Sequence, residues 1–143
     1  MLEWSEKFAT GHALMDTQHR MLIGYINRLE IHAQKPSLTP EDISLFMRAI
    51  EFLETYVLTH FREEEECMHR HKCPVQRDNK LAHGKFLAFF RAFKARLDAE
   101  GYRQELVQEL HEACSSWIQE HIMRLDVQLK PCLKSATGPV ELN

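Results

Sequence analysis

The chain has 143 residues, of which 44% are hydrophobic and 27% are charged, and its formal net charge is −3. This length allows one domain with a buried core and is too short for two domains of ordinary size. The composition lacks the basic footprint of proteins that bind nucleic acid or an anionic membrane, and no stretch approaches the ~20 apolar residues of a membrane span. The N-terminus shows no basic segment followed by an apolar run, so we expect a cytoplasmic protein.

The segment before Asp16 shows no sustained period, but Trp4, Phe8 and Leu14 could lay an extended arm across a core. Asp16 is a favourable N-cap residue, and apolar residues follow it at helical spacing. The pattern therefore predicts a packed N-terminal arm and then a first helix from Asp16 to about Ala33.

A linker over residues 34–38 separates the first helix from a strong helix start. Thr39 is suited to the N-cap, Pro40 to the first helical position, and two acidic residues follow in the first turn. The second helix is predicted to run from here to about Met68. Pro74 then forbids continuation but suits the first turn of another helix.

Two further stretches repeat the helical period with alternating steps of four and three. The third helix is predicted to end at Gly101, and the fourth within a few residues of Pro131. Their apolar stripes consist of Asn79, His83, Phe86, Phe90, Phe93 and Leu97 in one, and Leu106, Leu110, Ala113, Trp117 and His121 in the other. We expect an all-α fold, an antiparallel up-down four-helix bundle, as a single domain over residues 1–134 with a tail over 135–143.

Polar residues continue the apolar stripes at one end of each predicted helix. In an up-down bundle these ends lie level, so the following side chains should meet in one layer: His19, His60, Glu64, Asn79, His83, His121 and Asp126. Seven buried polar groups would each cost ~1–3 kcal/mol if left unpaired, which a purely structural role does not explain. We therefore expect a metal site.

The residue types narrow the choice of metal. Imidazoles and carboxylates without an inward thiolate suit iron, manganese or zinc, and two carboxylates from two helices could bridge two cations. Asp126 follows His121 by five residues, which on an ideal helix places the side chains ~140° apart. Either the site straddles this helix or a local wide turn brings the two together. His12, His32 and His111 fall off the inward stripes and are expected at the surface.

The four cysteines contain no CxxC pair, so reduced thiols in the core are expected rather than a disulfide framework, although oxidation could pair some of them. One alternative is a zinc site in the connection between the second and third helices, where cysteine and histidine alternate as Cys67, His69, His71 and Cys73. Spacing by one intervening residue matches none of the usual structural zinc patterns, which disfavours this alternative.

Several motifs spread over the chain resemble those of the hemerythrin family, specifically its bacterial single-domain members. The resemblance extends from Trp4 to Leu129. It rests on Trp4 with Gly11, Asp16-Thr17-Gln18-His19, His60-Phe61-Arg62-Glu63-Glu64 with Met68 and Pro74, His83 with Phe86, and Trp117-Ile118-Gln119-Glu120-His121 through Asp126.

This resemblance implies two non-haem iron ions in the bundle. Carried over by position, it implies that His19 and His60 bind one iron, that His83 and His121 bind the other, and that Glu64 and Asp126 bridge both. The first iron would keep an open position for dioxygen or a small anion. The implied lining of the oxygen pocket is Leu22, Phe61, Trp117, Ile118 and Ile122.

One position departs from the family pattern. The family has a histidine four residues before the one matched by His83, and here that residue is Asn79. An amide oxygen is a weak neutral ligand compared with imidazole. The second iron could bind Asn79 loosely, take water instead, or be lost, while Asp78 lies a helical step of ~100° away.

Three hypotheses follow for function. The first is a protein, not an enzyme, that binds dioxygen reversibly for storage, delivery or sensing, acting as a monomer without nucleic-acid or membrane partners. The second is an oxidase or peroxidase that uses the open position left by Asn79. The third is a degenerate bundle with weakened metal binding. Nothing in the sequence indicates a substrate channel with acid or base groups beyond the implied ligands, which favours the first hypothesis over the second.

Overall fold

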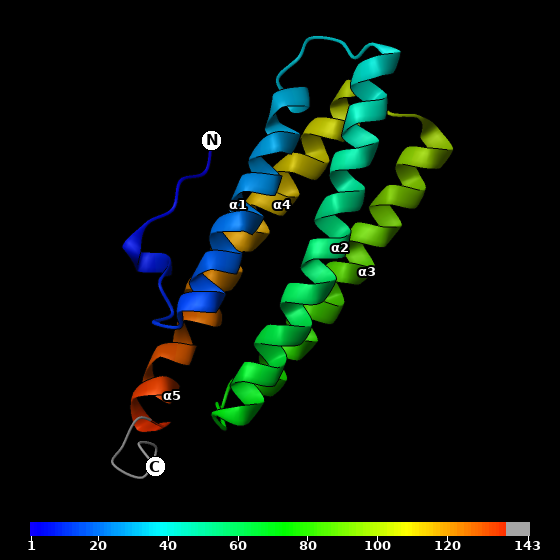
Figure 1. The fold of residues 1–143 in the computed structure, drawn as a ribbon. Coiled ribbons are helices and arrows are strands. Elements are labelled where there is room, and N and C mark those ends of the chain that lie inside the picture. Colours follow the sequence, from blue (N-terminus) through cyan, green and yellow to red (C-terminus); the bar gives the residue numbers. More distant parts are fainter. Residues whose placement is uncertain (137–143) are drawn as a thin grey trace.

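The computed structural model of the protein describes residues 1–136, with side chains described as far as residue 133. Its four long helices are α1 (Ala13–Ala33), α2 (Pro40–Arg70), α3 (Gln76–Glu100) and α4 (Gln104–Arg124). They run alternately up and down, and α1 packs against both α2 and α4 while α3 packs against α2 and α4 (Figure 1). No strand occurs among the described residues. The predicted all-α, antiparallel four-helix bundle is confirmed.

The N-terminal arm lies along α1 and contains one short 3₁₀ turn, η1 (Glu6–Phe8) (Figure 1). Phe8 is buried in the main core, and its ring lies 5.9 Å from that of Trp4, between ring centroids. The prediction that Leu14 packs against the core as part of this arm was wrong, because its side chain is 52% exposed. Leu14 already lies in the first turn of α1, where its neighbour Met15 takes the inward place.

The first helix begins three residues earlier than predicted. His12 is the N-cap residue, and its Nδ1 accepts a hydrogen bond from the Met15 amide at 3.4 Å. Asp16 instead accepts hydrogen bonds from the Thr10 amide and hydroxyl, both at 2.8 Å. Asp16 therefore fastens the arm to the helix rather than starting the helix.

The start of α2 is as predicted. Thr39 Oγ1 accepts from the Asp42 amide at 3.1 Å, while an Asp42 carboxylate oxygen accepts from the Thr39 amide at 2.9 Å. This reciprocal capping box satisfies two amide groups that a helix start otherwise leaves without partners.

The C-terminal end of α4 differs from the sequence prediction. The helix ends at Arg124, and the chain continues through a 3₁₀ turn, η2 (Asp126–Gln128), into a further helix, α5 (Leu129–Ala136). Pro131 thus lies in the first turn of α5, where a missing amide hydrogen is tolerated. The tail predicted to begin at 135 overlaps the end of α5, and residues 137–143 lie outside the described part.

A second core cluster lies at the α5 end of the bundle and consists of Met15, Cys67, Met68, Cys73, Leu129 and Cys132. Within it Cys73 and Cys132 form a disulfide, which contradicts the expectation of reduced thiols. The two cysteines are 59 residues apart in sequence, but the α2–α3 connection and α5 meet here, with Cα atoms 5.5 Å apart. Cys67 and Cys114 are free and buried.

His32 is another correction, because it was expected at the surface and is buried. Its ring meets that of Phe46 edge-on, with centroids 5.9 Å apart. Burial lowers the pKa of His32, and the nearby Lys35 lowers it further. His32 therefore serves as a neutral packing residue near the α1–α2 connection.

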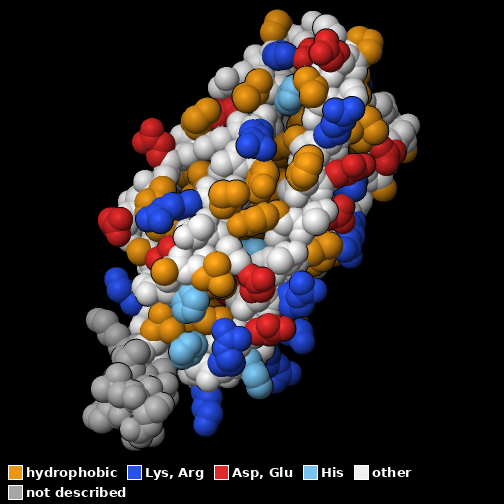
Figure 2. Space-filling view, viewed as in Figure 1, with side chains coloured by type: hydrophobic (Ala, Val, Ile, Leu, Met, Phe, Trp, Pro, Cys, Tyr) orange, Lys and Arg blue, Asp and Glu red, His pale blue; other side chains and the backbone are white. Residues whose placement is uncertain are grey.

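An apolar groove of about 480 Å³ lies between α1 and α2, toward their connection. Hydrophobic side chains gather over the middle of the face seen in Figure 2. The groove lining includes Ile31, Leu45 and Phe52, the last 64% exposed. No helix in the described part of the chain is long and apolar enough to cross a membrane.

Candidate metal centre

One polar layer crosses the bundle near its α5 end. The structure brings together all seven inward polar residues named above, and none is more than 3% exposed: His19, His60, Glu64, Asn79, His83, His121 and Asp126. Helix α1 supplies one of them, α2 and α3 supply two each, α4 supplies one, and η2 supplies Asp126. The antiparallel topology places these helix ends at the same level, which explains the convergence.

Glu64 lies at the centre of this layer. Its Oε2 is 2.9 Å from His19 Nε2 and 3.5 Å from His60 Nε2. Its other oxygen, Oε1, is 3.2 Å from His83 Nε2. The single carboxylate therefore directs one oxygen to each of two imidazole groups.

Asp126 repeats this arrangement from the opposite side. Its Oδ2 lies 3.2 Å from His19 Nε2, and its Oδ1 lies 3.1 Å from His121 Nε2. Because α4 ends at Arg124, the 3₁₀ turn carries Asp126 to the same side as His121, which a continuous helix would not do. The break in the helix thus resolves the angular mismatch of these two residues.

The donor atoms form two groups that share Glu64, and in each group the atoms lie within 4.8 Å of one another: His19, His60 and Glu64 in one, and Glu64, His83, His121 and Asp126 in the other. His83 Nε2, His121 Nε2 and Asp126 Oδ1 are buried without a hydrogen-bond partner. Buried lone pairs without a partner are costly, and a cation would satisfy them. The residues therefore fit a pair of divalent cations.

The ionisable groups of the layer shift one another's pKa values. Burial alone would lower the pKa of His19, but hydrogen bonds with Asp126 and Glu64 raise that pKa to about 10. Burial likewise opposes a charge on His83, but the carboxylates of Glu64 and Glu65 face its two ring nitrogens and raise its pKa to about 9. Both imidazoles are therefore protonated on both ring nitrogens and positively charged at neutral pH when no metal is bound.

The pKa of His60 shifts in the direction that burial favours, whereas the pKa of Glu64 shifts against it. Burial lowers the pKa of His60 to about 4, so this imidazole is neutral. Burial would raise the pKa of Glu64, but the neighbouring His60 and His19 hold it well below its ordinary value. Glu64 is therefore ionised throughout the ordinary pH range and available to cations.

Two of the imidazoles are oriented by residues to which the sequence pattern assigned no role. Gln18 Oε1 lies 2.6 Å from His60 Nδ1, and the Gln18 amide nitrogen donates in turn to Glu63. Glu65 Oε2 lies 2.8 Å from His83 Nδ1. Since these oxygens only accept, both imidazoles donate from Nδ1, which leaves Nε2 to face the layer.

Asn79 hydrogen-bonds inside the layer through its amide nitrogen. Nδ2 donates to Glu64 Oε1 at 2.9 Å and lies 3.3 Å from the Met68 sulfur. Its Oδ1 is buried without a partner. Only the N–H side of an amide can face a carboxylate favourably, so this orientation follows from the charge on Glu64.

Aromatic rings cover the imidazoles on one side of the layer. Phe61 stacks on His83, and Trp117 stacks on His121 with centroids 4.3 Å apart. Leu22, Ile118 and Ile122 are buried in the main core cluster. Their role in lining an oxygen pocket stays a prediction.

The alternative zinc site in the α2–α3 connection does not form in this structure. Cys73 is bonded to Cys132, so its sulfur is not available as the thiolate that binds zinc. Of the remaining three residues, Cys67 is fully buried and His69 is exposed. The cation-binding groups are confined to the polar layer within the described residues.

Comparisons with known proteins agree with this geometry. The family described as "Hemerythrin HHE cation binding domain" matches residues 10–133, which include every residue of the polar layer. The chain belongs to the hemerythrin family. A bacteriohemerythrin from Pseudomonas aeruginosa (strain LESB58) is 27% identical over 125 residues, which are 87% of this chain and 76% of that protein. The myohemerythrin of Sipunculus nudus is 25% identical over 127 residues, 89% of each chain.

A solved structure also shares the fold. The wild-type hemerythrin crystal structure superposes with a TM-score of 0.81 at 22% identity, covering 93% of this chain and 98% of that one. Membership of the hemerythrin family supports a diiron, oxygen-binding domain, and it agrees with a binding protein rather than an enzyme.

Proposed function

We propose that this chain holds two iron ions side by side in its polar layer and binds dioxygen reversibly there. His19 and His60 would hold one ion, His83 and His121 the other, and Glu64 and Asp126 both. The observation that supports this assignment is that each carboxylate directs one oxygen to each imidazole group. A carboxylate shared in this way offsets the charge of two cations at once.

The iron pair, when bound, supplies the reversible binding of dioxygen. The chain's own residues hold the imidazoles in place and keep water out. Gln18 and Glu65 accept hydrogen bonds from the Nδ1–H groups of His60 and His83, which keeps Nε2 free for a cation. The apolar side chains around the layer would exclude water, namely Leu22, Phe61, Trp117, Ile118 and Ile122.

The proposed role is storage, delivery or sensing of dioxygen by a monomer, with small anions such as azide competing for the same open position. No group in the layer beyond the proposed ligands and their hydrogen-bond partners is placed to act as an acid or base on a substrate. This arrangement favours binding over catalysis.

Metal analysis with an absorption spectrum tests this proposal. Protein reconstituted with iron should hold close to two irons per chain, and aerobic samples should show charge-transfer bands in the near ultraviolet that azide alters. Zinc in place of iron, or no iron after reconstitution, would contradict the proposal. Size-exclusion chromatography checks the expected monomer.

A further inference from the structure

The four imidazoles of the layer differ in the partners of their Nδ1 atoms. His60 is hydrogen-bonded to the neutral amide of Gln18, whereas His83 is hydrogen-bonded to the carboxylate of Glu65 at 2.8 Å. The Nδ1 atoms of His19 and His121 are buried without a hydrogen-bond partner. Only the His83 imidazole therefore carries a charged partner on its outer nitrogen.

The two oxygens of Glu64 differ as well. Oε1, which faces His83, also accepts the amide hydrogen of Asn79 at 2.9 Å. Oε2, which faces His19 and His60, accepts no hydrogen bond from an amide. A hydrogen bond to a carboxylate oxygen draws electron density from it, so Oε1 is the weaker donor toward a cation. The His83 side of the layer thus has the poorer carboxylate donor.

We propose that Glu65 is a positioning residue that strengthens His83 as a metal ligand and so offsets the weak donor set beside Asn79. A carboxylate that accepts the outer N–H of an imidazole fixes the ring and raises the basicity of the nitrogen that binds metal. The metal shared by His83 and His121 is then retained even though Asn79 contributes no imidazole. This inference rests on the proposed two-metal site.

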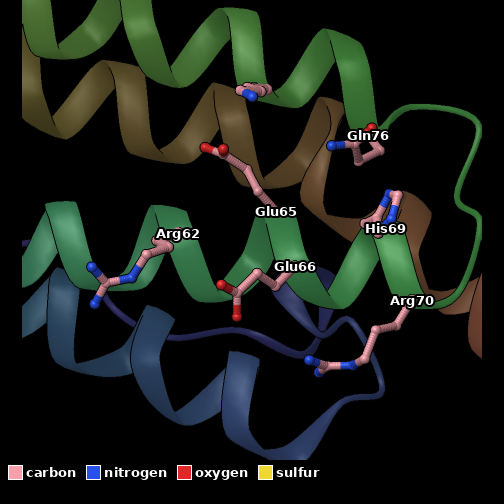
Figure 3. A pocket seen from close by; sticks show the side chains of 7 residues that line it. Arg62, Glu65, Glu66, His69, Arg70 and Gln76 are labelled. Carbon is pink, nitrogen blue, oxygen red and sulfur yellow. The ribbon is translucent and has the colours of Figure 1, made fainter.

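The surface around Glu65 makes the idea testable without disturbing the core. Figure 3 shows Glu65 extending from α2 toward α3, while the adjacent Glu66 turns away from α3. Both line a groove of about 360 Å³ whose other walls are Arg62, His69, Arg70, Gln76 and Lys80. The side chain of Glu65 is 21% exposed, so an isosteric Glu65→Gln change removes the charge without opening a cavity. Glu66→Gln removes the same charge from the same groove and serves as the matched control.

The first experiment measures metal release. Wild type, Glu65→Gln and Glu66→Gln are loaded with iron(II) under argon and challenged with a chelator, and iron per chain is followed over time. Wild type and Glu66→Gln should keep two irons. Glu65→Gln should release one of its two irons about 10–100-fold faster, the usual effect of losing such an outer partner. Circular dichroism of the metal-free proteins checks that all three fold alike.

A second arm separates positioning from a structural effect. If Glu65 offsets a weak donor set, adding an imidazole should make it dispensable, so the double variant Glu65→Gln/Asn79→His should recover slow release. In zinc-loaded protein, the NMR signal of the His83 Nδ1 proton should shift in Glu65→Gln and stay in place in Glu66→Gln.

The outcomes are distinct. Equal release by Glu65→Gln and Glu66→Gln would overturn the inference while leaving the two-metal site intact. Fast release by the double variant would show that Glu65 does not compensate for Asn79, and would also overturn it. A wild type that never holds two metals would overturn the proposed function, and the inference with it.

Discussion

The phenyl ring of Phe61 lies parallel to the imidazole of His83, with ring centroids 3.7 Å apart and ring planes 1° apart. Trp117 covers His121 in a similar way, with ring planes 12° apart. The two imidazoles proposed to bind one metal, His83 and His121, therefore each stack on an aromatic ring. Each ring limits rotation of the imidazole that it covers.

Phe61→Leu tests this relationship. Leucine keeps an apolar side chain but cannot stack, so the free energy of unfolding should fall by only about 1–3 kcal/mol. Iron should nonetheless leave the His83 position faster in a chelator challenge, because the ring is no longer held. Phe52→Leu, on the exposed groove, is the control and should change neither quantity. Unchanged iron release in Phe61→Leu would contradict the prediction.

The bridging role proposed for Glu64 and Asp126 predicts a second result. Glu64→Ala and Asp126→Ala each remove a charge that two cations would share, so both should abolish binding of an iron pair. Iron loading should no longer raise the thermal midpoint of either variant above that of the same variant without metal. The reason is that a ligand that binds only the folded state stabilises that state. Metal analysis and thermal unfolding check this. Two irons and an unchanged spectrum in either variant would refute the bridging assignment.

The disulfide predicts a dependence on reducing agents. Cys73 and Cys132 close a loop with a sequence separation of 59, and opening such a loop frees unfolded-chain entropy worth about 4 kcal/mol. A dithiol reductant should therefore lower the stability of the wild type by up to this amount in denaturant titrations. The Cys73→Ser/Cys132→Ser variant should start at the lower stability and show no response to reductant. A response of that variant would point to another thiol.

The raised pKa values of His19 and His83 predict a pH dependence. Both exceed the ordinary value of 6.5, so their contribution to stability in the metal-free protein is present below pH 6.5. It is lost as pH rises through about 9 and then about 10. Metal binds the neutral imidazoles, so iron uptake at pH 7 should release about two protons per chain.

Two measurements check this pH dependence. Calorimetry in buffers of different ionisation enthalpy should give the proton count, and metal-free protein should unfold more easily above pH 9. No proton release at pH 7 would show that both imidazoles are already neutral.

The sequence pattern located most of the polar layer for a simple reason. His60, Glu64 and His83 continue the apolar stripes of their helices, so helical periodicity alone places them inward. Asp126 was expected in the layer through a straddled helix or a local wide turn, whereas the structure ends α4 at Arg124 and uses a tighter 3₁₀ turn. Residues around Leu125 carry no helix breaker that would mark this end in the sequence.

Other features depend on contacts that no local pattern records. Cys73 and Cys132 are joined because the α2–α3 connection and α5 meet in space, whereas the sequence shows only two isolated cysteines. Glu65 lies off the inward stripe, in a run of four acidic residues that resembles a solvated face. Only its distance to His83 shows that it supports the layer.

The position of Asp126 on η2 also bears on the order of assembly during synthesis. His19 is the first of the proposed ligands to leave the ribosome and Asp126 is the last, after all four long helices have been made. A single domain generally folds as a unit, so the bundle packs at the same late stage of synthesis at which the last proposed bridging carboxylate is made. On the proposed assignment, a complete iron pair can form only after that carboxylate has been made. Iron capture should therefore follow the packing of the helices and complete maturation of the protein.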